Sequence, residues 1–196
     1  MSTLLADREL LNLQPHHRWT VAEYHRMAEV GLLTEDSRVE LIDGEIIEMA
    51  PIGSSHGGEV KYFSNKLAGQ LSGHVIVSAQ DPVVLDGYEE PQPDVALLRW
   101  RNDYYRTAHS HAEDVLLIIE MADSTLRYDR DVKVPLYAKN GIPEVWLLDI
   151  KNRQLEIYRE PLNGQYQQRA CHSMGNIAPT LCPDAMIDLA EIFPNS

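Results

Sequence analysis

The sequence predicts an α/β domain in which helices flank a mixed β-sheet. Three observations lead to this prediction. Segments with helical spacing of apolar residues alternate with segments of β type along the chain. Residues 115–119 form a continuous apolar run, as in a strand that is buried on both faces. The dipeptide Asp43-Gly44 separates two short β-type runs and predicts a hairpin near the N-terminus.

The first element after the N-terminal segment is a helix. Residues 1–18 are polar with scattered leucines, and we expect a flexible, loosely held arm. Residues 19–196 then form a single domain, because 196 residues suit one domain of ordinary size. Thr20-Val-Ala-Glu23 fits a capping box, which predicts a helix over residues 20–30 that ends at Gly31.

A second helix follows the hairpin, over residues 56–71. It has helical spacing of Val60, Phe63, Leu67 and Leu71. Strands are expected next, and their ranges are 74–78, 82–85, 94–98 and 115–119.

A third helix is capped by Ser124 or Thr125, is kinked at Pro135 and ends at Asn140-Gly141. Residues 144–149 predict another central strand. The remaining elements are an antiparallel pair over 155–158 and 166–170, and a short helix or turn over 186–193.

Composition limits the functions that the chain can have. Thirty acidic and seventeen basic residues give a net charge of −13, which argues against binding a polyanion through a broad basic surface. A metal ion and a local basic cluster can override that average field. No apolar run approaches the ~18 residues of a membrane span, so we expect no membrane contact. Two cysteines without a disulfide framework suit a reducing compartment, and a cytoplasmic location is expected.

Two carboxylates stand where strands begin and end. Pro93-Asp94 opens one strand, and Glu120 closes the next buried strand. If these strands are neighbours, both side chains can bind one hard cation, Mg²⁺ or Mn²⁺. Such an ion neutralises charge and activates water during hydrolysis of a phosphodiester. An ionised Glu120 after five apolar residues would be costly without a partner or a metal.

The pattern resembles the PD-(D/E)XK nuclease superfamily and, within it, the Uma-two family of restriction endonucleases, formerly a domain of unknown function. The resemblance covers residues 19–193. Its markers are Arg38-Val-Glu-Leu-Ile-Asp-Gly-Glu45, His56, Pro93-Asp94-Val-Ala-Leu97, Ile119-Glu-Met-Ala-Asp-Ser-Thr-Leu-Arg-Tyr-Asp-Arg-Asp-Val-Lys133 and Tyr137-Ala-Lys-Asn-Gly-Ile-Pro-Glu-Val-Trp146.

The resemblance implies a restriction endonuclease-like core with flanking helices and an extra N-terminal hairpin. It also implies that Asp94 and Glu120 bind the metal and that Glu40 is a third carboxylate. The lysine of the superfamily usually stands two residues after the glutamate, where this chain has Ala122. Lys133, on the following helix, matches the displaced lysine of the family.

Each candidate also has a structural interpretation. Asp94 could be a turn or capping residue, and Glu40 a solvent-facing hairpin residue. Asp129 and Lys133 are four residues apart, so they could form a surface ion pair. His56, like Asp129 a candidate for an accessory role in the site, could instead be a structural histidine at a helix start.

The resulting hypothesis is a Mg²⁺- or Mn²⁺-dependent endonuclease that hydrolyses DNA, with Lys133 orienting the attacking water and a homodimer cutting both strands. One alternative is a catalytically silent binding or regulatory module with the same fold. Another is a two-carboxylate hydrolase such as a glycosidase, whose activity would survive chelation. An aromatic and basic cluster can contact a substrate backbone or be a solvated insertion, and its members are Tyr104, Tyr105, Arg106, His109 and His111.

Overall fold

The computed structural model describes residues 16–34 and 36–193. The arm expected over residues 1–18 therefore lies mostly outside the described residues. The capping box is confirmed, because Thr20 and Glu23 bond each other's backbone N–H groups at the start of α2 (Val21–Glu29). No helix in the described ranges is long and apolar enough to cross a membrane.

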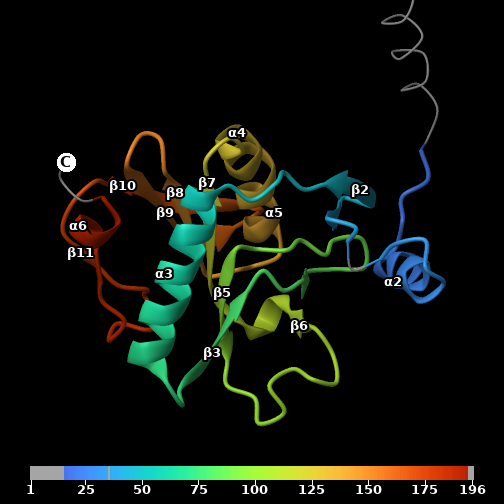
Figure 1. Cartoon of the computed structure of the whole chain (residues 1–196), viewed down its shortest axis with the longest axis horizontal. Coiled ribbons are helices and arrows are strands. Elements are labelled where there is room, and N and C mark those ends of the chain that lie inside the picture. Colours follow the sequence, from blue (N-terminus) through green and yellow to red (C-terminus); the bar gives the residue numbers. More distant parts are fainter. Residues whose placement is uncertain (1–15, 35, 194–196) are drawn as a thin grey trace, which may run out of the picture.

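A six-stranded mixed sheet forms the centre of the molecule, in the order β10-β9-β8-β7-β5-β3 (Figure 1). Only β7 and β8 are parallel within it, and every other neighbouring pair is antiparallel. The strands are β3 (Val75–Ala79), β5 (Val95–Arg99), β7 (Val115–Ala122), β8 (Glu144–Asp149), β9 (Gln154–Leu162) and β10 (Gln165–His172). The predicted α/β class with a mixed sheet is confirmed.

The predicted hairpin is also present, and it forms a separate two-stranded sheet. Strands β1 (Val39–Ile42) and β2 (Glu45–Glu48) pair around Asp43 and Gly44, which both have positive φ. In Figure 1 this hairpin and α2 lie beyond the edge of the main sheet, on the side away from the C-terminal elements. Those elements are β11 (Asn176–Ile177), β12 (Ile187–Asp188) and α6 (Leu189–Ile192).

The two faces of the sheet bury different side chains. Helix α3 (Ser54–Leu71) covers one face, and its buried residues are those predicted from helical spacing: Val60, Phe63, Leu67 and Leu71. Helix α5 (Val134–Lys139) covers the other face. Along β7, Ile119 and Met121 point to the α3 side, whereas Ile118 and Ala122 point to the α5 side. Alternation along the strand therefore sends Glu120 to the α5 side.

The third helix is divided into three segments. They are α4 (Leu126–Tyr128), a π-helical turn η2 (Asp129–Lys133), and α5, which has Pro135 in its first turn. Proline has no N–H for an intrahelical hydrogen bond, and its ring crowds the preceding turn. The irregularity expected at Pro135 is thus a π turn just before it.

Two strand predictions need correction. The strand that contains Glu120 does not stop there, because β7 continues to Ala122. The prediction ended this strand where the run of apolar residues ends, at the first charged side chain. A buried carboxylate that has hydrogen-bond or ionic partners can nevertheless lie within a strand. Residues 82–85 contribute only β4 (Val83–Val84), which pairs with β6 (Ser110–His111) outside the main sheet. The short 3₁₀ helix η1 (Ala112–Asp114) then leads into β7.

Candidate active site

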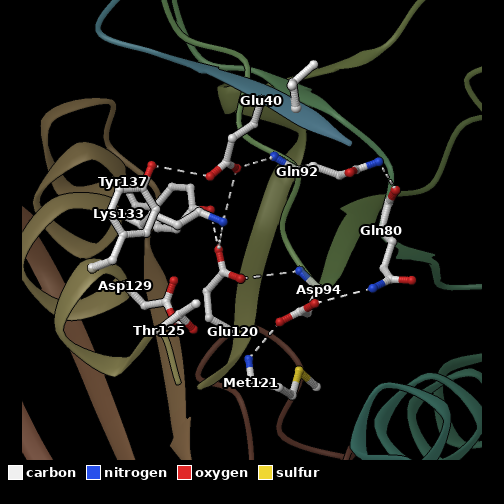
Figure 2. A network of polar contacts seen from close by, with 12 residues as sticks. Glu40, Gln80, Gln92, Asp94, Glu120, Met121, Thr125, Asp129, Lys133 and Tyr137 are labelled. Atoms are coloured by element: carbon white, nitrogen blue, oxygen red, sulfur yellow. Dashed lines mark hydrogen bonds and ion pairs between the residues drawn. The ribbon is translucent and has the colours of Figure 1, made fainter. Parts of the chain in front are cut away.

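The register of two antiparallel strands brings Asp94 beside Glu120. Val95 is paired with Ile119, so Asp94 faces Glu120 when the register continues by one residue. The backbone N–H of Asp94 donates to Glu120 Oε2 at 3.4 Å, and the N–H of Met121 donates to Asp94 Oδ2 at 2.9 Å. The two carboxylates are therefore fixed by the backbones of adjacent strands (Figure 2).

The ammonium group of Lys133 lies between two carboxylates, those of Glu120 and Glu40. Its Nζ is 2.9 Å from Glu120 Oε1 and 3.3 Å from Glu40 Oε2. Tyr137, one turn further along the helix, donates its hydroxyl to the same Glu120 oxygen at 2.5 Å. Lys133 and Glu120 are both almost fully buried, at 4% and 2% exposed. The third helix thus presents a cation and a hydroxyl to one carboxylate.

Glu40 comes from the hairpin and closes the other side of Lys133. Its Oε2 accepts the backbone N–H of Gln92 at 3.1 Å, and Tyr128 donates to its Oε1 at 3.3 Å. Glu40 is buried, so its interpretation as a solvent-facing residue is wrong. Whether it also binds a metal stays a prediction, since its contacts in the structure are to Lys133, Tyr128 and Gln92.

The two accessory candidates lie in the same region. His56, in the first turn of α3, places Nε2 2.7 Å from Asp94 Oδ1, whereas the Met121 N–H contacts Oδ2. Asp129 is buried and accepts a hydrogen bond from the Thr125 hydroxyl at 2.6 Å. The surface ion pair proposed for Asp129 and Lys133 is therefore wrong, because both are buried and Lys133 pairs with Glu120 and Glu40.

These side chains surround one cavity of about 240 Å³. All of the sequence-predicted site residues line it, and so do the exposed Arg38 and the segment over residues 49–53 that precedes α3. The members from the predicted set are Glu40, His56, Asp94, Glu120, Asp129 and Lys133.

Burial and charge shift the proton affinities of this cluster. Burial raises the pKa of Glu120 to about 8, and Asp94 and Asp129 add to the rise while Lys133 opposes it. Burial alone would lower the pKa of Lys133, but Glu120, Tyr137 and Glu40 hold it well above its usual range. Burial also raises the pKa of Asp129. A hydrogen bond to Asp94 raises the pKa of His56. The cluster has more carboxyl groups than its one buried lysine can neutralise. Binding of a further cation is therefore favoured.

Sequence reasoning missed the groups that support the site. Tyr137 was named only as part of a family marker, and no role was assigned to its hydroxyl, to Tyr128 or to the Gln92 N–H. The spacing of Tyr137 four residues after Lys133 was the available signal, because residues i and i+4 share one helical face. Tyr128 and Gln92 carry no comparable signal, since their contacts depend on how the hairpin packs against the sheet.

The donor set suits a hard divalent cation. The carboxylate oxygens of Asp94 and Glu120 face the cavity from fixed backbone positions, and Mg²⁺ and Mn²⁺ prefer oxygen ligands. The oxygens of Glu120 differ, because Oε1 is held by Lys133 and Tyr137 whereas Oε2 faces Asp94. A cation would therefore be bound by Asp94 and Glu120 Oε2.

Comparisons with known proteins agree with this architecture. The model of the Uma2 family, described as "Putative restriction endonuclease", matches residues 21–187. A crystal structure described as a "putative nuclease belonging to DUF820 from Anabaena variabilis" superposes with a TM-score of 0.68. It is 16% identical and covers 84% of this chain and 95% of its own length, so the likeness is one of fold. None of the curated proteins matches the chain.

Proposed function

We propose that this chain, which belongs to the Uma2 (Uma-two) family, is a nuclease that hydrolyses phosphodiester bonds of DNA with Mg²⁺ or Mn²⁺ at Asp94 and Glu120. The observation that supports this most is the strand register, which brings the two carboxylates side by side at one cavity, with Glu120 paired to the buried Lys133. A bound divalent ion would neutralise charge on the phosphate and lower the pKa of a water molecule.

The surrounding residues keep the two proposed ligands oriented. The Met121 N–H and His56 contact opposite oxygens of Asp94, which fixes the plane of its carboxylate. Tyr137 and Lys133 hold Oε1 of Glu120 and leave Oε2 directed toward Asp94. Outer contacts of this kind commonly matter 10- to 100-fold for metal affinity or activity. His56 and Tyr137 are thus positioning residues in this proposal.

Lys133 provides a charged hydrogen-bond donor of the site. Three N–H bonds on one ammonium can contact Glu120, Glu40 and a water molecule at the same time. The carboxylates around Lys133 keep it charged, so it would orient the attacking water rather than accept a proton from it. Glu40 would then hold the lysine in place, and Asp129 would add negative charge to the same cavity.

The start of α3 supports an anionic substrate. Its N-cap is Gly53, which lines the cavity and supplies no side-chain hydrogen bond to the first turn. The N-terminus of an 18-residue helix has free N–H groups and a partial positive charge, which favour phosphate. The exposed Arg38 adds a positive charge at the same cavity. These groups supply local positive potential for a phosphate although the whole chain has a net charge of −13.

The test is a cleavage assay on supercoiled plasmid and single-stranded DNA with Mg²⁺ or Mn²⁺, combined with Mn²⁺ titration by calorimetry. Asp94→Ala and Glu120→Ala should each lose cleavage and weaken Mn²⁺ binding while circular dichroism shows an intact fold. Asp184→Ala, which removes an exposed aspartate, should behave like the native protein. Cleavage that persists in both site variants would overturn the proposal.

The same experiment separates the two alternatives. A catalytically silent module would show no cleavage, and its interaction with DNA would not depend on Asp94 or Glu120. A two-carboxylate hydrolase of another class would keep its activity in EDTA. For DNA cut on both strands, two copies of the site are needed, so we propose a homodimer. Light scattering of the purified chain would measure its mass.

A further inference from the structure

A second cluster of possible metal ligands lies outside the cavity of Asp94 and Glu120. Within the described residues, His25, Glu90 and His109 are the one group of three such side chains whose ligand atoms all lie within 4.8 Å of one another. Nε2 of His25 is 2.7 Å from Glu90 Oε2, and the rings of His25 and His109 are 5.6 Å apart. None of these residues lines the first cavity.

We propose that His25, Glu90 and His109 form a binding site for a transition-metal ion of the Zn²⁺ class. Two imidazoles and one carboxylate are a ligand set that suits Zn²⁺, whereas Mg²⁺ prefers oxygen ligands alone. The site is therefore chemically distinct from the all-carboxylate site at Asp94 and Glu120. The two sites should select different metals from a mixture.

The backbone fixes the carboxylate of this second site. Glu90 is 3% exposed, and its backbone N–H donates to Leu41 O at 2.8 Å while its O accepts from Leu41 N at 3.3 Å. This bridge joins residue 90 to strand β1. A buried carboxylate whose ionised form costs solvation energy gains from a nearby cation. Glu90 thus supplies a rigid anionic ligand rather than a mobile one.

One segment, residues 83–90, also positions the two histidines. Val21 N at the start of α2 donates to Gly87 O at 2.9 Å, so the helix that carries His25 is tied to this segment. Strand β4, at the other end of the segment, pairs with β6, which begins directly after His109. The three ligands therefore come from three elements that meet at one short segment.

The position left for further ligands faces a second cavity. His25 and His109 line a hollow of about 510 Å³ together with His111, Tyr105 and Arg106. This leaves room for a water molecule or a fourth ligand in a tetrahedral site. It also connects the metal site to the aromatic and basic loop that the sequence analysis singled out.

The metal would act as a clamp on weakly packed parts of the fold. Helix α2 has no buried residue, and His109 is exposed on its loop. Binding one ion to both would hold the helix and the loop against the segment at Glu90. The proposal predicts stabilisation by Zn²⁺ without any change in the residues of the first cavity.

The test is Zn²⁺ titration of the chelator-treated full chain by calorimetry, with excess Mg²⁺ present to occupy the carboxylate site. The native protein should bind one equivalent, and Zn²⁺ should raise its melting temperature. His109→Ala should weaken this binding by about tenfold or more, since a lost ligand should matter at least as much as a lost outer contact. His74→Ala, which removes an exposed histidine elsewhere, is the matched control.

Spectroscopy and activity complete the experiment. Co²⁺ in place of Zn²⁺ should give the visible bands of a tetrahedral site with nitrogen ligands in the native chain and in His74→Ala, but not in His109→Ala. His25→Ala should also lose these bands but keep its metal-dependent cleavage of DNA, because His25 lies outside both the first cavity and the aromatic and basic cluster. Because His109 is exposed, His109→Ala should fold even if Glu90→Gln does not. Equal Zn²⁺ affinity in native protein and His109→Ala would overturn the proposal.

Discussion

The backbone N–H of Asp94 donates to Glu120 Oε2 across two antiparallel strands, at 3.4 Å. This contact ties the geometry of the site to the register of the sheet, since a shift of one residue would send Glu120 to the other face. The two carboxylates therefore lie together because of β5 and β7, and the helix that follows β7 supplies the lysine.

Metal affinity should depend on pH through Glu120. Burial raises the pKa of Glu120 to about 8, so below that pH the metal-free carboxyl group keeps its proton. A cation needs the ionised form, and binding must therefore release a proton. Apparent Mn²⁺ affinity should rise up to about tenfold per pH unit until the pH nears 8 and then level off.

Calorimetry in buffers of different ionisation enthalpy measures both the affinity and the protons released. Asp184→Asn, which changes an exposed carboxylate, should show the same pH profile as the native chain. Equal Mn²⁺ affinity on the acidic side and near pH 8 would contradict this role of Glu120.

Lys133→Met should lower both stability and activity. Above about pH 8, where Glu120 is ionised, the change leaves Glu120 and Glu40 buried without their shared cation, and breaking a buried pair in this way costs about 3–5 kcal/mol. Cleavage should fall by a factor on the order of 100, as for other groups that position a proton or a water molecule. Urea unfolding and a DNA cleavage assay measure the two effects.

The matched control for this change is Lys61→Met, because Lys61 is exposed on α3. Its effect on the free energy of unfolding should stay within about 0.5 kcal/mol. If Lys133→Met were no more harmful than Lys61→Met, Lys133 would have no part in holding the carboxylates.

Sequence patterns within single helices and hairpins were sufficient to predict most of the fold. The capping box at Thr20, the Asp43-Gly44 hairpin and the apolar spacing of α3 each depend on neighbouring residues, and all three are present. The extent of β7 was not predictable in this way. Glu120 is tolerated inside the strand because Lys133 and Tyr137, from a later helix, contact its side chain.

The candidate site shows the same limit of local reasoning. Asp94 could be predicted from its position just before a strand and Glu120 from the five apolar residues that precede it, with the family resemblance as support. The pairing of Lys133 with Glu40 could not, because it joins a hairpin near the N-terminus to a helix about 90 residues later. Periodicity suggested a partner for Lys133 on its own helix, at Asp129, but the buried acids outside the helix bind it instead.

Tyr137→Phe should shift the pH profile of metal binding. The hydroxyl of Tyr137 donates to Glu120 and thereby lowers the pKa of that carboxyl group against the larger effect of burial. Without it, the pKa of Glu120 should rise, and Mn²⁺ binding should level off at a higher pH than in the native chain. A merely structural role would lower stability but leave this pH profile in place.

The loss in free energy of unfolding caused by Tyr137→Phe can be estimated as well. A hydrogen bond to a charged group contributes about 1.5–3 kcal/mol, so urea unfolding above about pH 8, where Glu120 is ionised, should show a loss in that range for Tyr137→Phe. Tyr88→Phe, at a partly exposed tyrosine of the segment before Glu90, serves as the control. An unchanged pH profile would remove Tyr137 from the positioning residues.

The pH dependence of folding should be carried in part by Glu156 on strand β9, which pairs with Arg130 of the third helix. Burial acts to raise the pKa of Glu156, but hydrogen bonds from Arg130 and Tyr158 outweigh it and lower the pKa below the ordinary 4.5. A carboxyl group with a lowered folded-state pKa stabilises the fold fully above its unfolded pKa. That stabilisation is lost as the pH falls through the folded-state pKa.

Glu156→Gln should therefore be less stable than the native chain at neutral pH, by about 2 kcal/mol for the lost charged hydrogen bonds. The difference should shrink as the pH falls below 4.5, because the native carboxyl group then takes up a proton and loses the same contacts. Urea unfolding over this pH range measures it, with Glu45→Gln as an exposed control. A difference that stays constant into acid would mean that Glu156 acts through packing, since packing does not change with its protonation.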